Sequence, residues 1–314
     1  REKRLFLFLD EDCESPNWEA ELKAIYDLEG IKMVCTGSTS SLIKSQGGRL
    51  TGRQIVTLIY PLSFKEFVLL REKEISVAED YKYEKLVEEY LNTGGYPENV
   101  LKPDEIYLSN LLEDIISRDL VRLFQIRKPG LLKDLLRLLA ASIGSRTSFN
   151  KLSNILNVSL DTIKEYIGYF ESAFLVNLLE KWSTSYSEKV YASKKLYFQD
   201  TGIMSLFTGR GDLGKKAENV VFLHLLREGE PCGYYAETER EVDFVLGDFD
   251  SVLPIEVKYS SHFNWQDKGF GGVKLFLHRF PQTKEVLIIS RDVEKEIKEK
   301  NVAIKVIPLW KFLS

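Results

Sequence analysis

Cysteine, histidine and methionine are scarce in this chain of 314 residues, which has 3 Cys, 3 His and 2 Met. The cysteines lie far apart, show no CxxC spacing and do not group with the histidines; they are Cys13, Cys35 and Cys232. Disulfide frameworks and zinc sites both need closely spaced ligands, so neither is expected here.

Long hydrophobic runs are also absent. The longest, such as LFLFL at 5–9, are far too short to cross a bilayer, and no signal peptide is recognisable. We therefore expect a protein without membrane association, in a reducing cytoplasm. The first residue is Arg1 and not Met, which we interpret as a sign that a preceding segment was removed or never included.

A strong excess of one charge is missing too, since the formal net charge is −4. Residues 191–314 hold equal numbers of basic and acidic side chains, so the broad basic footprint of many duplex-binding nucleases is absent. A local basic patch is still compatible with the sequence, since four lysines lie close in sequence to the charged segments described below: Lys194, Lys195, Lys215 and Lys216. With 44% hydrophobic and 29% charged residues, the chain is long enough for two or three globular units.

Three charged residues interrupt two apolar segments near the C-terminus. Segments 242–246 and 253–259 flank the turn-forming sequence GDFDS at 247–251, which predicts a β-hairpin. The alternation of side chains places Glu256 and Lys258 on one strand face, and pairing brings Asp243 beside Glu256.

Converging carboxylates repel each other unless a cation lies between them, and Mg²⁺ prefers oxygen ligands of this kind. A lysine two residues after the second carboxylate can orient or deprotonate an attacking water. The alternative is an exposed hairpin whose charges serve only solubility.

Residues 215–229 predict an amphipathic helix that ends at Gly229 and carries Glu218 in its first turn. A helix with an acidic residue, followed by a D…ExK hairpin, resembles the PD-(D/E)XK nuclease superfamily. The resemblance implies that Asp243 and Glu256 are metal ligands, Lys258 activates water, and Glu218 is a further catalytic acid. A decayed or purely structural copy of that fold is the alternative.

The stretch LFLFLDED at 5–12 predicts a buried central strand that ends in two acidic residues, and it looks like a Walker B strand. That likeness implies that Asp10 holds Mg²⁺ on a nucleotide and that Glu11 polarises the attacking water. A helix is predicted at 17–30 and a second apolar strand at 31–42. Thr36 and Ser38 are the candidates for a polar residue that senses the γ-phosphate.

The order LDE, NWE, TGS, LTGR and PLSFKEF over residues 9–67 resembles a family of prokaryotic, especially archaeal, AAA-type ATPases. Further matching stretches are TGGYPE at 93–98, SRDL at 117–120, KKLYFQDTG at 194–202 and ENVVF at 218–222. In that family a PD-(D/E)XK-like domain without a firmly assigned function follows the ATPase. Arg49 and Arg53 are either arginine fingers or loop arginines that pair with nearby acids.

One part of the family pattern is missing, because no GxxxxGK[ST] loop precedes Asp10. The stretch GRGDLGKK at 209–216 has the glycine spacing but places Lys216 where Mg²⁺ binding needs Ser or Thr. We expect that it is not a phosphate-binding loop. The economical explanation is a longer parent protein, in which ATP and Mg²⁺ bind a site that begins upstream.

The middle of the chain is predicted to be helical at 79–92, 104–124 and 131–144. Helices at 147–156 and 160–174 then form a helix-turn-helix, with Ser159 or Asp161 as the cap of the second, and a β-rich wing follows at 189–198. Their mixed charge suits a phosphate backbone poorly, so packing within the protein is favoured over DNA recognition.

The sequence thus predicts an α/β multi-domain protein with a partial AAA-type P-loop NTPase core, a helical lid, a winged helix-turn-helix and a PD-(D/E)XK-like α/β domain. The expected domains are 1–70, 71–130, 131–190 and 191–314. One functional hypothesis is an ATPase with a Mg²⁺-dependent DNA phosphodiesterase. The other is an ATPase coupled to a non-cleaving module that binds nucleic acid or protein. A homo-oligomer is compatible with either.

Overall fold

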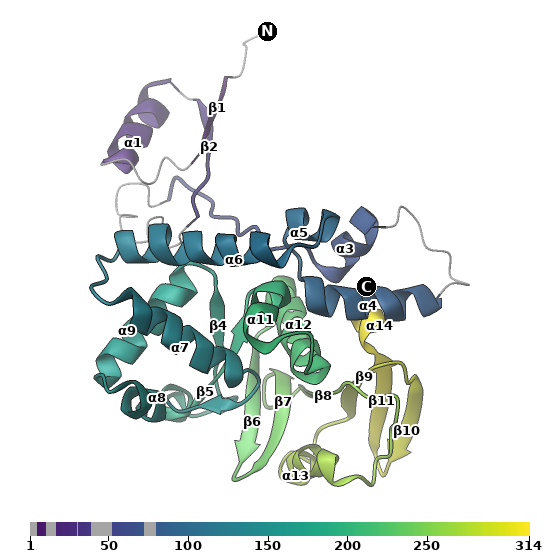
Figure 1. Cartoon of the computed structure of the whole chain (residues 1–314). Coiled ribbons are helices and arrows are strands. Elements are labelled where there is room, and N and C mark those ends of the chain that lie inside the picture. Colours follow the sequence, from purple (N-terminus) through teal and green to yellow (C-terminus); the bar gives the residue numbers. More distant parts are fainter. Residues whose placement is uncertain (1–4, 11–16, 30, 39–51, 72–79) are drawn as a thin grey trace.

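The computed structural model describes residues 5–10, 17–29, 31–38, 52–71 and 80–314 (Figure 1). Two of the predicted nucleotide-site residues, Glu11 and Arg49, lie outside the described residues. None of the described helices combines the length and the apolar character that a membrane span requires.

The N-terminal elements are β1 (Phe6–Leu9), α1 (Trp18–Glu29) and β2 (Lys32–Cys35), with the two strands paired in parallel. The predicted strand, helix and strand are confirmed, and the helix serves as the crossover that a parallel pair needs. The prediction of a buried central strand is wrong for the described residues, since Phe8 is 73% exposed. Within that part β1 has one strand neighbour, and Trp18 and Leu22 form only a small core.

Helices dominate the middle of the chain, as predicted. The long segment expected at 104–124 divides into an α-helix capped by Asp104, which accepts from the Ile106 amide, and a π-helical stretch. The elements are α3 (Phe64–Arg71), α4 (Asp80–Thr93), α5 (Pro97–Leu101), α6 (Glu105–Asp114), the π-helical stretch (Ile115–Arg122) and α7 (Pro129–Ala141).

A three-stranded antiparallel sheet of order β3-β5-β4 follows, and the two helices α8 and α9 lie between β3 and β4 in the chain. Ser159 caps α9 by accepting from the Thr162 amide, which decides between the two predicted caps. The wing predicted at 189–198 is wrong in its first part, where α10 forms because Ser185 caps a helical turn. The elements are β3 (Arg146–Thr147), α8 (Phe149–Leu156), α9 (Leu160–Ser172), β4 (Val176–Leu179), α10 (Tyr186–Tyr191) and β5 (Lys194–Phe198).

The C-terminal sheet has six strands in the order β10-β11-β9-β8-β7-β6. Strands β6, β7 and β8 form an antiparallel meander, and α13 then crosses over to β9, which is parallel to β8. The elements are α11 (Thr201–Thr208), α12 (Leu213–Glu228), β6 (Cys232–Glu237), β7 (Arg240–Gly247), β8 (Val252–Lys258), α13 (Gly271–Arg279), β9 (Glu285–Ser290), β10 (Lys295–Glu299), β11 (Val302–Pro308) and α14 (Leu309–Phe312).

Each face of this sheet has its own core. Adjacent residues of β7 point to opposite faces, so Phe244 joins the large core with α12, whereas Val245 joins a second core with α13. The predicted hairpin of β7 and β8 is confirmed, with Phe244 opposite Ile255. The sequence did not predict the charged edge strand β10, which makes β11 an internal strand.

Segments far apart in the chain meet at a buried junction. Gly95 donates its amide to Asp200 Oδ2 at 2.6 Å, and its carbonyl accepts from the Leu62 amide at 2.7 Å. Arg227 of α12 donates to the Pro61 carbonyl at 2.5 Å. The stretches that carry the family resemblance, PLSFKEF, TGGYPE and QDTG, therefore pack together and hold the segment before α3 against α12.

Candidate active site

Helix α12 presents the first acidic residue of the site. Asp212 caps the helix by accepting from the Lys215 amide, and the helix ends at Gly229, as predicted, with this glycine in the left-handed conformation. The helix begins at Leu213, so Glu218 lies in its second turn and not in the first. Its side chain is 15% exposed.

The hairpin supplies two more carboxylates side by side. Asp243 Oδ2 accepts from the Val257 amide at 2.9 Å, and the Asp243 amide donates to Glu256 Oε2 at 3.4 Å. Glu256 is only 3% exposed, so the alternative of a solvated hairpin is wrong. Most of β8 is buried, and Glu256 lies in this buried part of the strand, whereas Lys258 at its end is only partly buried.

Lys258 completes the predicted set. Its Nζ lies 2.7 Å from Glu256 Oε1, and its side chain is 40% exposed. The structure therefore brings together the four residues predicted for the C-terminal site, Glu218, Asp243, Glu256 and Lys258, from one helix and two strands. The exposed lysine marks the side from which a solute can approach.

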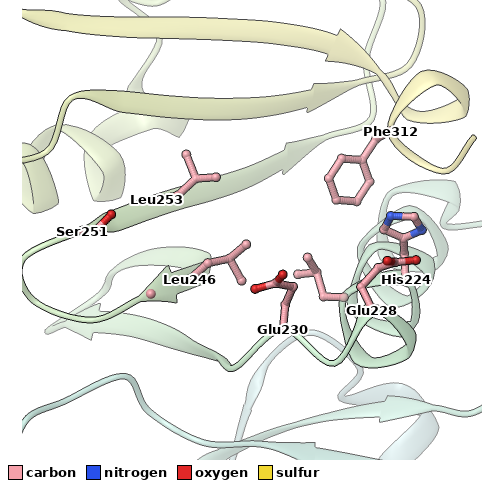
Figure 2. Close-up of a pocket in the computed structure, with 9 residues that line it drawn as sticks. His224, Glu228, Glu230, Leu246, Ser251, Leu253 and Phe312 are labelled. Atoms are coloured by element: carbon pink, nitrogen blue, oxygen red, sulfur yellow. The ribbon is translucent and has the colours of Figure 1, made fainter.

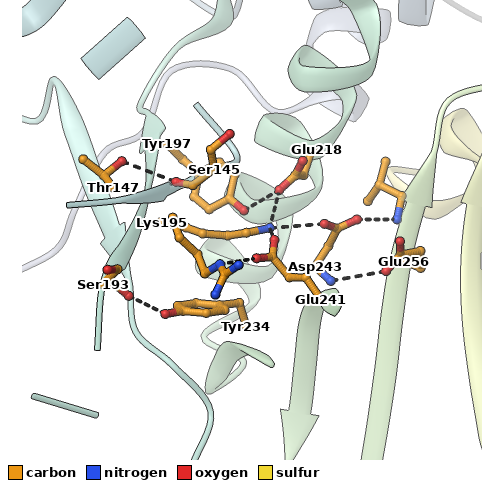
Figure 3. A network of polar contacts seen from close by, with 12 residues as sticks. Ser145, Thr147, Ser193, Lys195, Tyr197, Glu218, Tyr234, Glu241, Asp243 and Glu256 are labelled. Carbon is orange, nitrogen blue, oxygen red and sulfur yellow. Dashed lines mark hydrogen bonds and ion pairs between the residues drawn. The ribbon is translucent and has the colours of Figure 1, made fainter. Parts of the chain in front are cut away.

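A second lysine, which the sequence placed only in a local basic patch, lies in the middle of the cluster. Lys195 of β5 is completely buried, and its Nζ lies 2.9 Å from Glu218, 2.6 Å from Glu241 and 3.2 Å from Asp243 (Figure 3). Burial of an ammonium group is costly unless carboxylates compensate it, and here three do so. Its position directly before the apolar residues LYF in the same strand was the available signal.

Two more side chains from the three-stranded sheet reach the same centre. Arg146 of β3 contacts Glu241 Oε2 with Nε at 3.1 Å, and the Tyr197 hydroxyl donates to Glu218 Oε1 at 2.7 Å. Four carboxylates thus face three cationic side chains, Lys195, Lys258 and Arg146. The sequence did not predict Glu241, Arg146 or Tyr197 as members of this site.

Burial and mutual repulsion shift the protonation of these groups. Burial, and after it the charge of Asp243, raise the pKa of Glu256 to about 8 and that of Glu218 to about 7. Burial lowers the pKa of Lys195, but the surrounding negative groups outweigh it and hold the pKa well above the usual value. The lysine is therefore charged, and the carboxyl groups around it compete for limited positive charge.

Whether this centre fits a metal ion depends on the oxygen atoms that point inward. Glu218, Asp243 and Glu256 supply the hard oxygen donors that Mg²⁺ prefers. In this conformation one oxygen of each carboxylate is already paired with a lysine. Lys195 pairs with Glu218 and Asp243, and Lys258 pairs with Glu256. Among the described residues, no group of three or more His, Cys, Asp or Glu is arranged to hold a metal ion.

A separate hollow of about 420 Å³ opens beside the far end of α12, between β7, β8 and α14 (Figure 2). His224 lies at its wall with its ring centroid 4.9 Å from that of Phe312, and burial lowers the pKa of His224. Leu246 and Leu253 line the strand side, and Glu228 and Glu230 lie at the helix side. No residue of the acidic centre lines this hollow.

The predicted nucleotide residues lie at the ends of β1 and β2. The Thr36 hydroxyl donates a hydrogen bond to Asp10 Oδ1, so these two candidates are in contact. Ser38 follows Thr36 by two residues. Arg53 Nε lies 3.5 Å from Asp27 Oδ1, with both side chains about 40% exposed. This contact favours the interpretation of Arg53 as a loop arginine that pairs with a nearby acid.

The glycine-rich stretch at 209–216 is a helix connection. Lys216 is completely buried and donates from Nζ to Asn92 Oδ1 and to the Gly209 carbonyl, each at 2.8 Å. Its ammonium group therefore joins α4 to α12 and is not directed at a phosphate.

Three protein families match successive parts of the chain. Residues 1–68 match an AAA domain, residues 84–213 match a domain of unknown function (DUF8612), and residues 213–312 match a second one (DUF4143). The chain is therefore similar to AAA-family ATPases over its N-terminal part. The two remaining families carry no assigned activity.

Relatives over nearly the full length are uncharacterized. One from Methanocaldococcus jannaschii, MJ1544, is 29% identical over 98% of this chain and 74% of its own length. One from Haemophilus influenzae is 26% identical over 94% of this chain and 74% of its own length. The refined half-complex of Thermococcus gammatolerans McrB AAA+ hexamers with bound McrC matches at 12% identity over 55% of this chain and 46% of that one, with a TM-score of 0.25, too low to support an argument.

Proposed function

We propose that this chain couples an AAA-type nucleotide-binding domain to a C-terminal Mg²⁺-dependent phosphodiesterase that acts on DNA. The observation that carries the proposal is the convergence of Glu218, Asp243, Glu256 and Lys258, which come from α12, β7 and β8. The order of α12, three antiparallel strands, α13 and a parallel β9 supports a PD-(D/E)XK-type fold. The chain order α7, β3, α8, α9, β4 and β5 likewise supports a winged helix-turn-helix before it.

In this site Glu218, Asp243 and Glu256 are the side chains that would hold the ion. A bound Mg²⁺ supplies a Lewis acid for the phosphate and lowers the pKa of its water. The Lys258 side chain is 40% exposed, so its ammonium group can contact an incoming phosphate. Glu256 holds that ammonium in position through the 2.7 Å ion pair. The hydrogen bond that the Val257 amide donates to Asp243 Oδ2 orients the second carboxylate.

At the N-terminal end, the match to an AAA domain and the contact of Thr36 with Asp10 support a role in nucleotide binding. We infer that Asp10 holds Mg²⁺ on ATP and that Thr36 orients its carboxylate. Roles for Glu11, Ser38 and Arg49 remain predictions from the family resemblance. An association into homo-oligomers and the identity of a protein partner are likewise proposals.

The test is a hydrolysis assay with Mg²⁺ or Mn²⁺ on single-stranded, duplex and branched DNA. We expect metal-dependent cleavage by the intact chain and a loss of at least about 100-fold in the Asp243→Ala, Glu256→Ala variant, because both proposed ligands are removed. Asp250→Ala is the matched control, since this exposed aspartate lies in the turn of the same hairpin. Equal rates in the double variant and the control would rule the site out.

A second candidate function has its own observation. Because Lys195 and Lys258 already neutralise the carboxylates, the domain can persist as a non-cleaving module that binds DNA or protein for the ATPase. DNA binding that is unchanged in the double variant, with no cleavage by any form of the chain, would favour this candidate.

A further inference from the structure

Lys195 occupies the middle of the acidic centre, and the hydrolysis proposed above gives it no part. Its Nζ lies within 3.2 Å of three carboxylates, two of which are proposed metal ligands, Glu218 and Asp243. Figure 3 shows the ammonium group at the point toward which these side chains converge. It therefore fills the space in which a cation shared by Glu218 and Asp243 must lie.

The charges of the centre give a second reason to connect this lysine with the metal. Four carboxylates, Glu218, Glu241, Asp243 and Glu256, face the three positive charges of Lys195, Lys258 and Arg146. A divalent ion that entered this space beside the Lys195 ammonium would bring positive charges into contact inside the protein, which burial makes costly. A divalent ion that replaces the ammonium avoids this repulsion and keeps Glu218 and Asp243 paired with a cation.

We propose that Lys195 is an internal counter-ion that occupies the position of the divalent cation in this conformation, so that metal binding requires displacement of its ammonium group. This inference rests on the proposed function, because it concerns the same carboxylates. It adds that the centre has two forms. In one the Lys195 ammonium pairs with the carboxylates, and in the other a divalent ion takes its place.

The origin of Lys195 indicates what controls this exchange. The lysine belongs to β5 of the three-stranded sheet, whereas the carboxylates belong to α12 and the C-terminal sheet. Contacts join the two sheets close by: Arg146 of β3 pairs with Glu241, and the Tyr234 hydroxyl of β6 donates to the Ser193 carbonyl. Strand β5 is also fixed to α12, because the Phe198 amide donates to Asn219 Oδ1 and the Phe198 carbonyl accepts from Asn219 Nδ2, each at 2.8 Å. The exchange therefore requires the Lys195 side chain to change its conformation while the two sheets stay in place.

The experiment is Mn²⁺ binding by calorimetry to the full chain and to its Lys195→Gln variant. We expect the variant to bind one Mn²⁺ at least tenfold more tightly than the unaltered chain, and Mn²⁺ to raise its melting temperature more. Glutamine removes the charge but keeps an N–H donor for the carboxylates. Lys195→Met is the second variant, and it removes the donor as well.

Two controls separate this effect from a general change of charge. Lys194→Met alters the neighbouring lysine, whose Nζ pairs with Glu180 outside the centre at 2.8 Å, and should leave Mn²⁺ affinity unchanged. Adding Asp243→Asn to Lys195→Gln should abolish the gain. The inference is overturned if folded Lys195→Gln binds Mn²⁺ no more tightly than the unaltered chain, or if the gain survives Asp243→Asn.

Failure of the inference and failure of the proposed function look different. Tighter Mn²⁺ binding by Lys195→Gln, with no DNA cleavage by any variant, supports the counter-ion and removes the phosphodiesterase. Tight Mn²⁺ binding and cleavage by the unaltered chain, both unaffected by Lys195→Gln, retain the phosphodiesterase and remove the counter-ion.

Discussion

Individual side chains in this protein acquire their chemistry from burial more than from their position in a motif. Glu256 and Lys258 are separated by one residue, yet the carboxylate is 3% exposed whereas the lysine side chain is 40% exposed. The difference makes Glu256 a buried acid with a pKa of about 8 and leaves Lys258 able to meet a solute. A D…ExK pattern alone does not distinguish these two environments.

His224 gives a pH-dependent prediction outside the acidic centre. Burial lowers its pKa below the usual 6.5, and the neighbouring Glu228 and Arg227 act in opposite directions. The unfolded chain therefore takes up a proton near pH 6.5 that the folded chain does not, so this histidine makes the fold less stable as the pH falls below about 6.5. In His224→Gln we expect this loss to disappear, with a difference in slope of at most about 1.4 kcal/mol per pH unit.

Denaturant unfolding of both proteins between pH 7.5 and 5 measures this difference. His262→Gln is the matched control, because the His262 side chain is 77% exposed. Parallel stability curves for the unaltered chain and His224→Gln would show that His224 takes up its proton equally in both states.

Among the packed elements, α13 lies very close to β7. This close contact depends on Gly272, which has no side chain at the point where the helix meets the strand. A Cβ atom at Gly272 would overlap the backbone carbonyl of Glu241, whereas one at Gly271 would meet no atom within 4 Å. The glycine lets α13 lie directly on the strand that carries Asp243. Helix packing thus supports the site from the face opposite α12.

Substitution at these neighbouring glycines should have opposite effects. We expect Gly272→Ala to lower the free energy of unfolding by about 1–3 kcal/mol, because backbone must move to admit the methyl group. Gly271→Ala should leave it unchanged or raise it by up to about 1 kcal/mol, because alanine is less flexible in the unfolded chain. Urea unfolding followed by tryptophan fluorescence reports on this core, which contains Trp182 and Trp265. Equal stabilities of the two variants would contradict the predicted overlap.

Over the whole molecule, the described residues from 64 to 313 form one large core and a second core under α13, whereas β1, α1 and β2 have a small one of their own. The junction of Gly95, Asp200 and Arg227 links the segment before α3 to α12, and hence to the acidic centre. This arrangement ties the segment at 61–62 to the helix that carries Glu218.

Hydrogen exchange of the full chain tests this division. We expect the amides of β1 and β2 to exchange at least about tenfold faster than those of β8 and β9, because the two-stranded sheet has little apolar cover. Strands β8 and β9 lie inside a six-stranded sheet with cores on both faces. Similar protection of the two sheets would indicate that the N-terminal elements are as stable as the main core.

Local patterns were enough to predict much of this architecture. The apolar strands, the caps Ser159 and Gly229, and the hairpin around GDFDS follow from turn chemistry and periodicity over a few residues. The short edge strand β10 was not predicted, because its sequence KEIKE is charged and forms a strand only by pairing with β11. The exposure of β1 could not be foreseen either, since burial depends on which neighbours a strand finds.

For the acidic centre, periodicity and spacing alone place Asp243, Glu256 and Lys258 together, because they lie on one hairpin whose register is local. Comparison with a known motif added Glu218 on the preceding helix. Only the tertiary structure brings in Lys195, Arg146 and Tyr197, which lie on another sheet and enter through its packing against β7. A charged group's role depends on the charges that surround it, and contacts between distant segments decide those surroundings.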